Sequence, residues 1–327
     1  MLTIKENFLE CIRGGHPDRY VNQFEALATV SANPLFRKDD VDENGFSYDE
    51  WGVYWASKDL PGRMPIHDME HRVVKDIANW REYVKKPLGM NDPAKWECIA
   101  EMAEKVDPNK MRTASIAPGV FERLHDLCEI QETCIALYEE PEAIHDLIKV
   151  ITEVELEQAE MACKAIKPEA LFHHDDWGSD ASTFMSVEMF EEFLMPAYKL
   201  IYGYYKDHGV QVIVHHSDSF GATLVPDMIE LGIDVWQGAV ESNNLPELVD
   251  KYAGQIAIMS GIESQIVDRP DWTPELVNET VDNAIASIGH KTYFIPCHTR
   301  GGAGSIFPGV YDTVSARIDY RSSIDFA

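Results

Sequence analysis

Cationic residues are scarce in this sequence. Lysine and arginine together number 28, against 56 aspartate and glutamate residues, which gives a formal net charge of −28 at pH 7. A chain this acidic repels nucleic-acid backbones and anionic lipid, so neither is an expected partner. The charge also disfavours substrates with many carboxylates, unless the binding pocket itself is locally basic.

Long apolar runs and paired cysteines are also missing. No segment has the roughly 18 or more consecutive apolar residues that suggest a membrane-spanning helix. The N-terminal stretch MLTIKENFLECIRGG lacks the apolar core of a signal peptide. The six cysteines contain no C-x-x-C pair; they are Cys11, Cys98, Cys128, Cys134, Cys163 and Cys297. We therefore expect a reduced, cytoplasmic protein.

Apolar strands and amphipathic helices alternate along the chain. Hydrophobic residues make up 45% of the sequence, enough for a large core. Runs such as residues 209–214, 232–238 and 254–262 are typical of buried strands, and helical patterns separate them. This predicts an α/β fold, a (β/α)8 TIM barrel with extra N-terminal helices. We expect a single domain over residues 1–327, with about 1–105 as the helical elaboration. A doubly wound open sheet is the alternative.

Metal-binding side chains follow two of the predicted strands, at the end where barrel enzymes carry their chemistry. Alternate residues of an extended chain face the same side, so His216 and Asp218 are expected to point together. With Cys297 or His298 from the last strand, they would form a three-residue metal site with an open position. A thiolate ligand favours zinc. The alternative interpretation is a hydrogen-bonded pair beside a buried cysteine.

The segment HHDDWG, residues 173–178, is a second candidate site. Its carboxylates and histidines predict a general acid–base pair, for which we select His174 and Asp176. The alternative is that the aspartates satisfy loop backbone or cap the next helix. Trp177 is either a stacking wall for a flat ligand or, more simply, part of the core.

Three further polar residues follow other predicted strands. Gln237 and Arg300 are candidates for substrate binding, and Glu263 is a candidate catalytic carboxylate. Arg300 opens the glycine-rich segment RGGAGS, which lacks the Lys-Ser/Thr pair of a phosphate-binding loop. We therefore interpret residues 300–305 as a mobile lid.

Several of these motifs together resemble a known family. HHDDWGSD, PAYKL, HSDSFGATLVPDMIELGIDVWQG and the final YFIPCH follow in the order found in the uroporphyrinogen decarboxylase superfamily. The resemblance covers most of the chain and is greatest to the cobalamin (corrinoid)-dependent methyltransferases. In that branch the zinc ligands are a His-x-Cys motif and a later cysteine. His216 matches the histidine, Asp218 replaces the first cysteine, and Cys297 or His298 matches the last ligand.

The resemblance implies an activity. The protein would move a methyl group from a small methylated substrate, for which we select a methoxylated aromatic, to the cobalt of a separate corrinoid protein. Replacement of cysteine by Asp218 makes the ligand set harder, which suits an oxygen-bearing methyl donor such as an O-demethylase uses. Zinc is the expected metal, a corrinoid protein the expected partner, and a homodimer is possible.

Two other functions stay open. A decarboxylase of a smaller acid would use Asp176 without metal, and a barrel that has lost turnover would only bind its ligand. True uroporphyrinogen decarboxylases carry an arginine-rich N-terminal motif, of which GGHPDRYVNQF retains only Arg19 and Tyr20. The missing arginines argue against a substrate with eight carboxylates.

Overall fold

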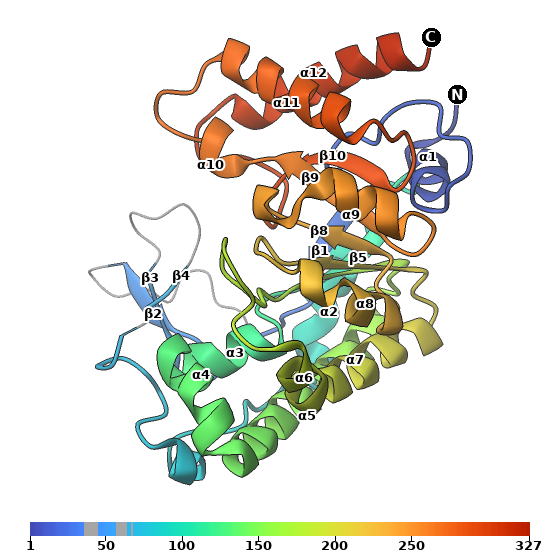
Figure 1. Cartoon of the computed structure of the whole chain (residues 1–327). Coiled ribbons are helices and arrows are strands. Elements are labelled where there is room, and N and C mark those ends of the chain that lie inside the picture. The colour runs from blue at the N-terminus through green and yellow to red at the C-terminus, as the bar shows by residue number, and fades with distance from the viewer. Residues whose placement is uncertain (36–44, 57–63, 67) are drawn as a thin grey trace.

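The computed structural model describes residues 1–35, 45–56, 64–66 and 68–327. Seven parallel strands form one sheet in sequence order (Figure 1). They are β1 (Leu27–Ser31), β5 (Met111–Ile116), β6 (Ala170–His174), β7 (Val212–His216), β8 (Val235–Gln237), β9 (Ala257–Ile262) and β10 (Phe294–His298). A doubly wound sheet would reverse its strand order at a switch point. The sequential order excludes that alternative and confirms the TIM-barrel class.

Two apolar clusters lie on opposite faces of the curled sheet. The inner cluster joins Leu27 of the first strand to Ile295 of the last, together with Phe172 and Val214 from the middle strands. Side chains from both edge strands therefore meet in one interior, as they do in a barrel. The larger cluster packs the outer face of the sheet against the helices. Within the described residues, the sheet has seven strands rather than eight.

Helices cover the outside of the sheet (Figure 1). The helices that follow β5 to β10 are α3 (Val120–Cys128), α4 (Ile130–Glu139), α5 (Pro141–Ala165), α6 (Val187–Met189), the π-helix η3 (Phe190–Leu194), α7 (Met195–Asp207), η4 (Ala222–Leu224), α8 (Val225–Glu230), η5 (Glu241–Asn243), α9 (Leu245–Tyr252), α10 (Ser264–Val267), α11 (Pro274–Ile288) and α12 (Val310–Asp325). Among the described residues, each is too short or too polar to cross a lipid bilayer.

Local sequence signals explain where α11 begins and ends. The Thr273 side chain accepts a hydrogen bond from the Leu276 backbone N–H at 3.2 Å, and Pro274 occupies the first turn. At the other end, Gly289 has a φ of 68°, a left-handed conformation that glycine adopts without strain. A cap, an apolar face and a terminal glycine thus define this helix before any tertiary contact forms.

The N-terminal third contains strands as well as helices. The expected helices are present as α1 (Ile4–Ile12), η1 (Ile77–Glu82), η2 (Pro93–Trp96) and α2 (Glu97–Glu104). The same region also supplies barrel strand β1 and a small antiparallel sheet of β2 (Phe46–Tyr48), β3 (Tyr54–Ala56) and β4 (Met64–Pro65). Describing residues 1–105 as a helical elaboration is therefore incomplete.

A buried ion pair anchors the small sheet to the barrel. Asp49 Oδ2 lies 2.5 Å from Arg123 Nη1 on α3, and both side chains are buried. Asp49 also accepts hydrogen bonds from the Trp51 and Val53 backbone N–H groups at 2.9 Å. The turn before β3 is thereby held against the helix that follows β5.

Candidate functional site

Strands β6 and β7 end side by side, each with a pair of histidines. The register pairs His173 with His215 and His174 with His216. His174 and His216 are in phase with Phe172 and Val214, which belong to the barrel interior, so their rings face the inside of the barrel mouth. The two ring centroids lie 4.2 Å apart.

The other two histidines face the helices. The hydroxyl of Tyr202 on α7 lies 3.2 Å from His173 Nδ1 and 3.0 Å from His215 Nδ1. His173 Nε2 lies 2.5 Å from the Glu155 carboxylate on α5. This polar layer between sheet and helices keeps His173 and His215 away from the barrel mouth. His216 is therefore the site-facing member of its pair.

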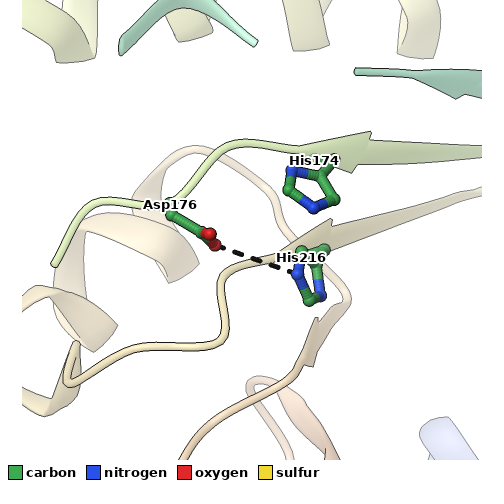
Figure 2. A group of neighbouring side chains, drawn as sticks. All are labelled: His174, Asp176 and His216. Atoms are coloured by element: carbon green, nitrogen blue, oxygen red, sulfur yellow. Dashed lines mark ion pairs between the residues drawn. The ribbon is translucent and has the colours of Figure 1, made fainter. Parts of the chain in front are cut away.

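Asp176 completes a group of three candidate ligands. It follows β6 by two residues, and its Oδ1 lies 3.8 Å from His216 Nε2. One ligand atom each of His174, Asp176 and His216 lies within 4.8 Å of the other two. Figure 2 shows the carboxylate and the two rings pointing toward a shared space. Two imidazoles and one carboxylate are a donor set that zinc and other divalent transition metals accept.

The far nitrogen of each ring is held by a protein oxygen. Glu122 Oε2 lies 2.9 Å from His174 Nδ1, and Gln237 Oε1 lies 2.5 Å from His216 Nδ1. His216 Nε2 is buried and has no hydrogen-bond partner among the described residues. Metal-binding histidines show this pattern, in which one nitrogen donates to an oxygen and the other keeps its lone pair for the metal.

The surroundings of the two site histidines shift their pKa values in opposite directions. Burial lowers the pKa of His174, but the charge and hydrogen bond of Glu122 outweigh this and raise it to about 10. Burial, followed by the charge of His174, lowers the pKa of His216 well below its ordinary value. Burial and the nearby Glu122 raise the pKa of Asp176. Without a metal, the site therefore holds one charged and one neutral imidazole.

Gly301 lies directly against the two site histidines. A Cβ atom at this position would stand 2.7 Å from His216 Nε2 and 2.9 Å from His174 Nε2. Such contacts are too short for any side chain, so the absent side chain leaves space between the ligand atoms. Gly301 of the glycine-rich segment therefore lies next to the site, and the interpretation of residues 300–305 as a mobile lid stays a prediction.

Four other residues predicted from the sequence lie around this group. Gln237 is buried and bonded to protein at both ends of its amide. Trp177 is buried, stacks on His215 at 3.9 Å and donates its indole N–H to Tyr198, as its interpretation as a core residue expects. Arg300 lies 3.7 Å from Asp268.

Glu263 follows β9 and accepts a hydrogen bond from the Glu241 backbone N–H at 2.7 Å. Burial, followed by the neighbouring carboxylates, raises its pKa to about 7. The carboxyl group is therefore partly protonated near neutral pH.

Three predicted metal ligands lie outside the group. Asp218 is exposed and donates its backbone N–H to Asp176 Oδ1 at 3.0 Å. Cys297 is buried in the apolar barrel interior, and burial raises the pKa of its thiol well above the ordinary value. His298 packs against Phe24, with a ring-centroid distance of 5.5 Å. Only His216 of the four predicted ligands belongs to the group.

Glu122 is a site residue that sequence reasoning missed. It lies in the first turn of α3, and its charge fixes the His174 ring. Asp175 caps the same first turn, because its carboxylate accepts the Phe121 and Glu122 backbone N–H groups at 3.0 and 2.8 Å. A glutamate in the first turn of a helix after a barrel strand is the only signal in the sequence for it.

Comparison with known proteins identifies the family of this chain. A family model described as uroporphyrinogen decarboxylase (URO-D) matches residues 61–296, well over half of the chain. The chain belongs to this family. A search among curated proteins finds no match.

One solved structure shares the fold of this URO-D family member over nearly its whole length. A structure described as a methyltransferase from Methanosarcina mazei has a TM-score of 0.67 and 13% identity, over 98% of this chain and 99% of that one. A D-psicose 3-epimerase solved in the presence of D-fructose has a TM-score of 0.42 and 11% identity, over 73% of this chain and 86% of that one. At 13% identity the likeness to the methyltransferase is one of fold.

Proposed function

We propose that this URO-D family member is a methyltransferase that moves a methyl group from a small methylated substrate to the cobalt of a separate corrinoid protein. The observation that carries the proposal is the convergence of His174, Asp176 and His216 at the carboxyl ends of β6 and β7. Barrel enzymes place their chemistry at this end. The fold shared with the M. mazei methyltransferase is consistent with this assignment.

The three residues are suited to hold a divalent metal such as zinc. The buried, unpartnered Nε2 of His216 supplies a lone pair, and the Gly301 backbone leaves room beside it. A metal bound there would polarise the oxygen of a methyl ether as a Lewis acid. Glu122 would orient the His174 ring through Nδ1.

If His174 and Asp176 are metal ligands, another residue must supply the proton to the leaving oxygen. Glu263 is then our candidate for protonating the leaving oxygen, because its pKa of about 7 leaves it partly protonated at neutral pH. The assignment of His174 and Asp176 as an acid–base pair applies only to a metal-free reaction.

A methoxylated aromatic is the proposed methyl donor. The residues around the mouth, including Glu122, Asp180 and Glu241, are acidic, so donors without a carboxylate group are favoured. Neutral methoxyphenols are therefore the first compounds to test. The corrinoid partner, a homodimeric state and a cytoplasmic location remain predictions from the sequence.

The test uses free reduced cobalamin in place of the natural partner. Purified protein, loaded with zinc, is mixed with cob(I)alamin and a panel of methoxyphenols, and methylcobalamin is followed by its absorbance. We expect the His216→Gln and Asp176→Asn variants to lose both bound zinc and methyl transfer. His290→Gln, at a surface histidine paired with Asp250, is the matched control. Full methyl transfer by variants that bind no zinc would refute the proposal.

Decarboxylation of a small acid is the second candidate. The raised pKa of Asp176 favours it, because a protonated carboxyl group can donate to a carbanion. A polycarboxylate substrate is disfavoured, since Arg19 pairs with Asp18, Arg123 with Asp49 and Arg300 with Asp268. Release of CO2 from a candidate acid, unaffected by chelator, would support this function instead.

A further inference from the structure

Gln237 links a site histidine to the glycine-rich segment. It ends strand β8, and its side chain is fully buried. Its Oε1 lies 2.5 Å from His216 Nδ1. Its Nε2 donates to the backbone carbonyls of His298 at 3.0 Å and Arg300 at 3.1 Å. A single amide therefore contacts both the ring and the backbone beside it.

The chemistry of these contacts determines the orientation of the amide. If the amide were turned over, its oxygen would face two carbonyl oxygens, and no hydrogen bond could form on that side. Gln237 Oε1 consequently faces His216, and an oxygen can only accept. His216 must then carry its hydrogen on Nδ1, which leaves the lone pair on the buried, unpartnered Nε2.

The same amide holds the backbone of residues 298–301 over the site. Gly301 follows Arg300 directly, and a Cβ on it would touch both site histidines. Several other contacts also hold this segment. Ser264 N–H donates to the Thr299 hydroxyl at 3.1 Å, His298 pairs with Ile262 in the β9–β10 register, and the Arg300 side chain lies 3.7 Å from Asp268. Thr299 N–H donates to Ile262 O at 3.1 Å, and Arg300 N–H donates to Ser264 Oγ at 3.2 Å. Gln237 Nε2 adds hydrogen bonds to the carbonyls of His298 and Arg300 and a longer contact to Thr299 O at 3.5 Å, so this one amide contacts three consecutive residues of the segment.

We propose that Gln237 is a positioning residue that holds His216 in the Nδ1-protonated form and, through the same amide, holds residues 298–301 closed over the site. The proposal builds on the metal site of the proposed function. It reassigns Gln237 from substrate binding, since both ends of its side chain are engaged by protein. The state of the histidine and the position of the segment are then coupled.

Two variants separate the two contacts. Gln237→Glu keeps an oxygen that accepts from His216 but loses the donor to the carbonyls of His298 and Arg300. Gln237→Leu loses both contacts while retaining a buried side chain. Gln158→Leu is the matched control, because Gln158 is also buried and donates its Nε2 to the Ala32 carbonyl at 2.9 Å.

Three properties are measured in each variant: the protonated nitrogen of His216, the rate of cleavage after Arg300, and the affinity for Zn²⁺. Nitrogen-15 NMR of histidine-labelled, metal-free protein reports which ring nitrogen of His216 is protonated, with His216→Gln giving the assignment. Trypsin cleavage after Arg300 reports opening of the segment. Competition with a chromophoric chelator gives the affinity for Zn²⁺. The first two measurements require no metal.

The expected results differ between the variants. In Gln237→Leu, the His216 hydrogen moves toward Nε2, zinc affinity falls about 10–100-fold, and cleavage after Arg300 accelerates about 5–30-fold. In Gln237→Glu, cleavage accelerates while the Nδ1 hydrogen remains. Gln158→Leu matches the native protein in all three.

Native behaviour of Gln237→Leu in the NMR and trypsin measurements would overturn the proposal. Failure of the native protein to bind zinc would count against the proposed function instead, while the two metal-free measurements would still decide the role of Gln237.

Discussion

Replacing Gly301 with alanine tests the site without changing any candidate ligand. The added methyl would lie 2.7 Å from His216 Nε2, 2.9 Å from His174 Nε2 and 2.6 Å from His174 Cδ2. Zinc bound to imidazole needs a Zn–N distance of about 2.0–2.1 Å. The methyl group and a metal would therefore compete for one space. Gly301 does not have a left-handed φ, so its backbone conformation itself tolerates alanine.

The expected effect is a loss of zinc affinity of about 100-fold or more, because the methyl blocks two ligand atoms and second-sphere changes alone cost 10–100-fold. The overlap with the two rings should also lower the free energy of unfolding by about 1–3 kcal/mol, as overpacking of a buried site does. The assay is chelator competition for Zn²⁺, with thermal unfolding as the check on folding.

Gly302→Ala is the control that isolates the contact. A Cβ at Gly302 has no neighbour within 4 Å, and this residue also lacks a left-handed φ. It should bind zinc like the native protein. If Gly301→Ala binds zinc as tightly as Gly302→Ala, the space beside Gly301 is not where the metal lies, and the site assignment is wrong.

Three further predictions follow from the structure. Glu122→Gln removes the charge that raises the His174 pKa, so NMR titration should show that pKa falling, with zinc affinity about 10–100-fold weaker; an unchanged titration would contradict the pairing. Cys297→Ser should leave the spectrum of the Co²⁺-substituted protein unchanged, because the thiol lies outside the group; a thiolate-to-cobalt band that disappears in the variant would show that Cys297 is a ligand. The hydrogen bond from Arg317 lowers the pKa of Asp282. Its stabilisation is therefore present above the unfolded pKa of about 3.9 and is lost as pH falls through the folded value. Asp282→Asn should cost about 0.5–1 kcal/mol at pH 7 in urea unfolding, and a difference that persists at pH 2 would refute this.

The C-terminal half was predictable because its local signals agree with the tertiary structure. Strand β7 (Val212–His216) overlaps the strand predicted within residues 209–214, and Thr273 and Gly289 mark the ends of helix α11. The N-terminal third gave weaker signals. Strands of two or three residues, such as β2 and β4, are too short to show a period, and β1 lies between irregular segments.

The position of Asp218 outside the three-residue group has a specific physical cause. The expectation that His216 and Asp218 point together assumes that the chain stays extended beyond His216. Strand β7 ends at His216, so the alternation of side chains ends there as well. Asp176 lies beyond the end of β6 in the same way, yet its loop brings the carboxylate to within 3.8 Å of His216. Periodicity cannot predict the direction of side chains in loops.

The sequence alone predicted alternating strands and helices, polar residues at the carboxyl ends of the strands, and His216 as a candidate site residue. These depend on periodicity and on local capping, which are properties of neighbouring residues. Only the tertiary structure decided that His174 and Asp176 join His216, that Glu122 and Gln237 orient the two rings, and that Gly301 lies against them. Those contacts join residues that are far apart in the sequence: Gln237 is 21 positions from His216, and Glu122 is 52 positions from His174. They depend on strand register and helix placement, which no local pattern records.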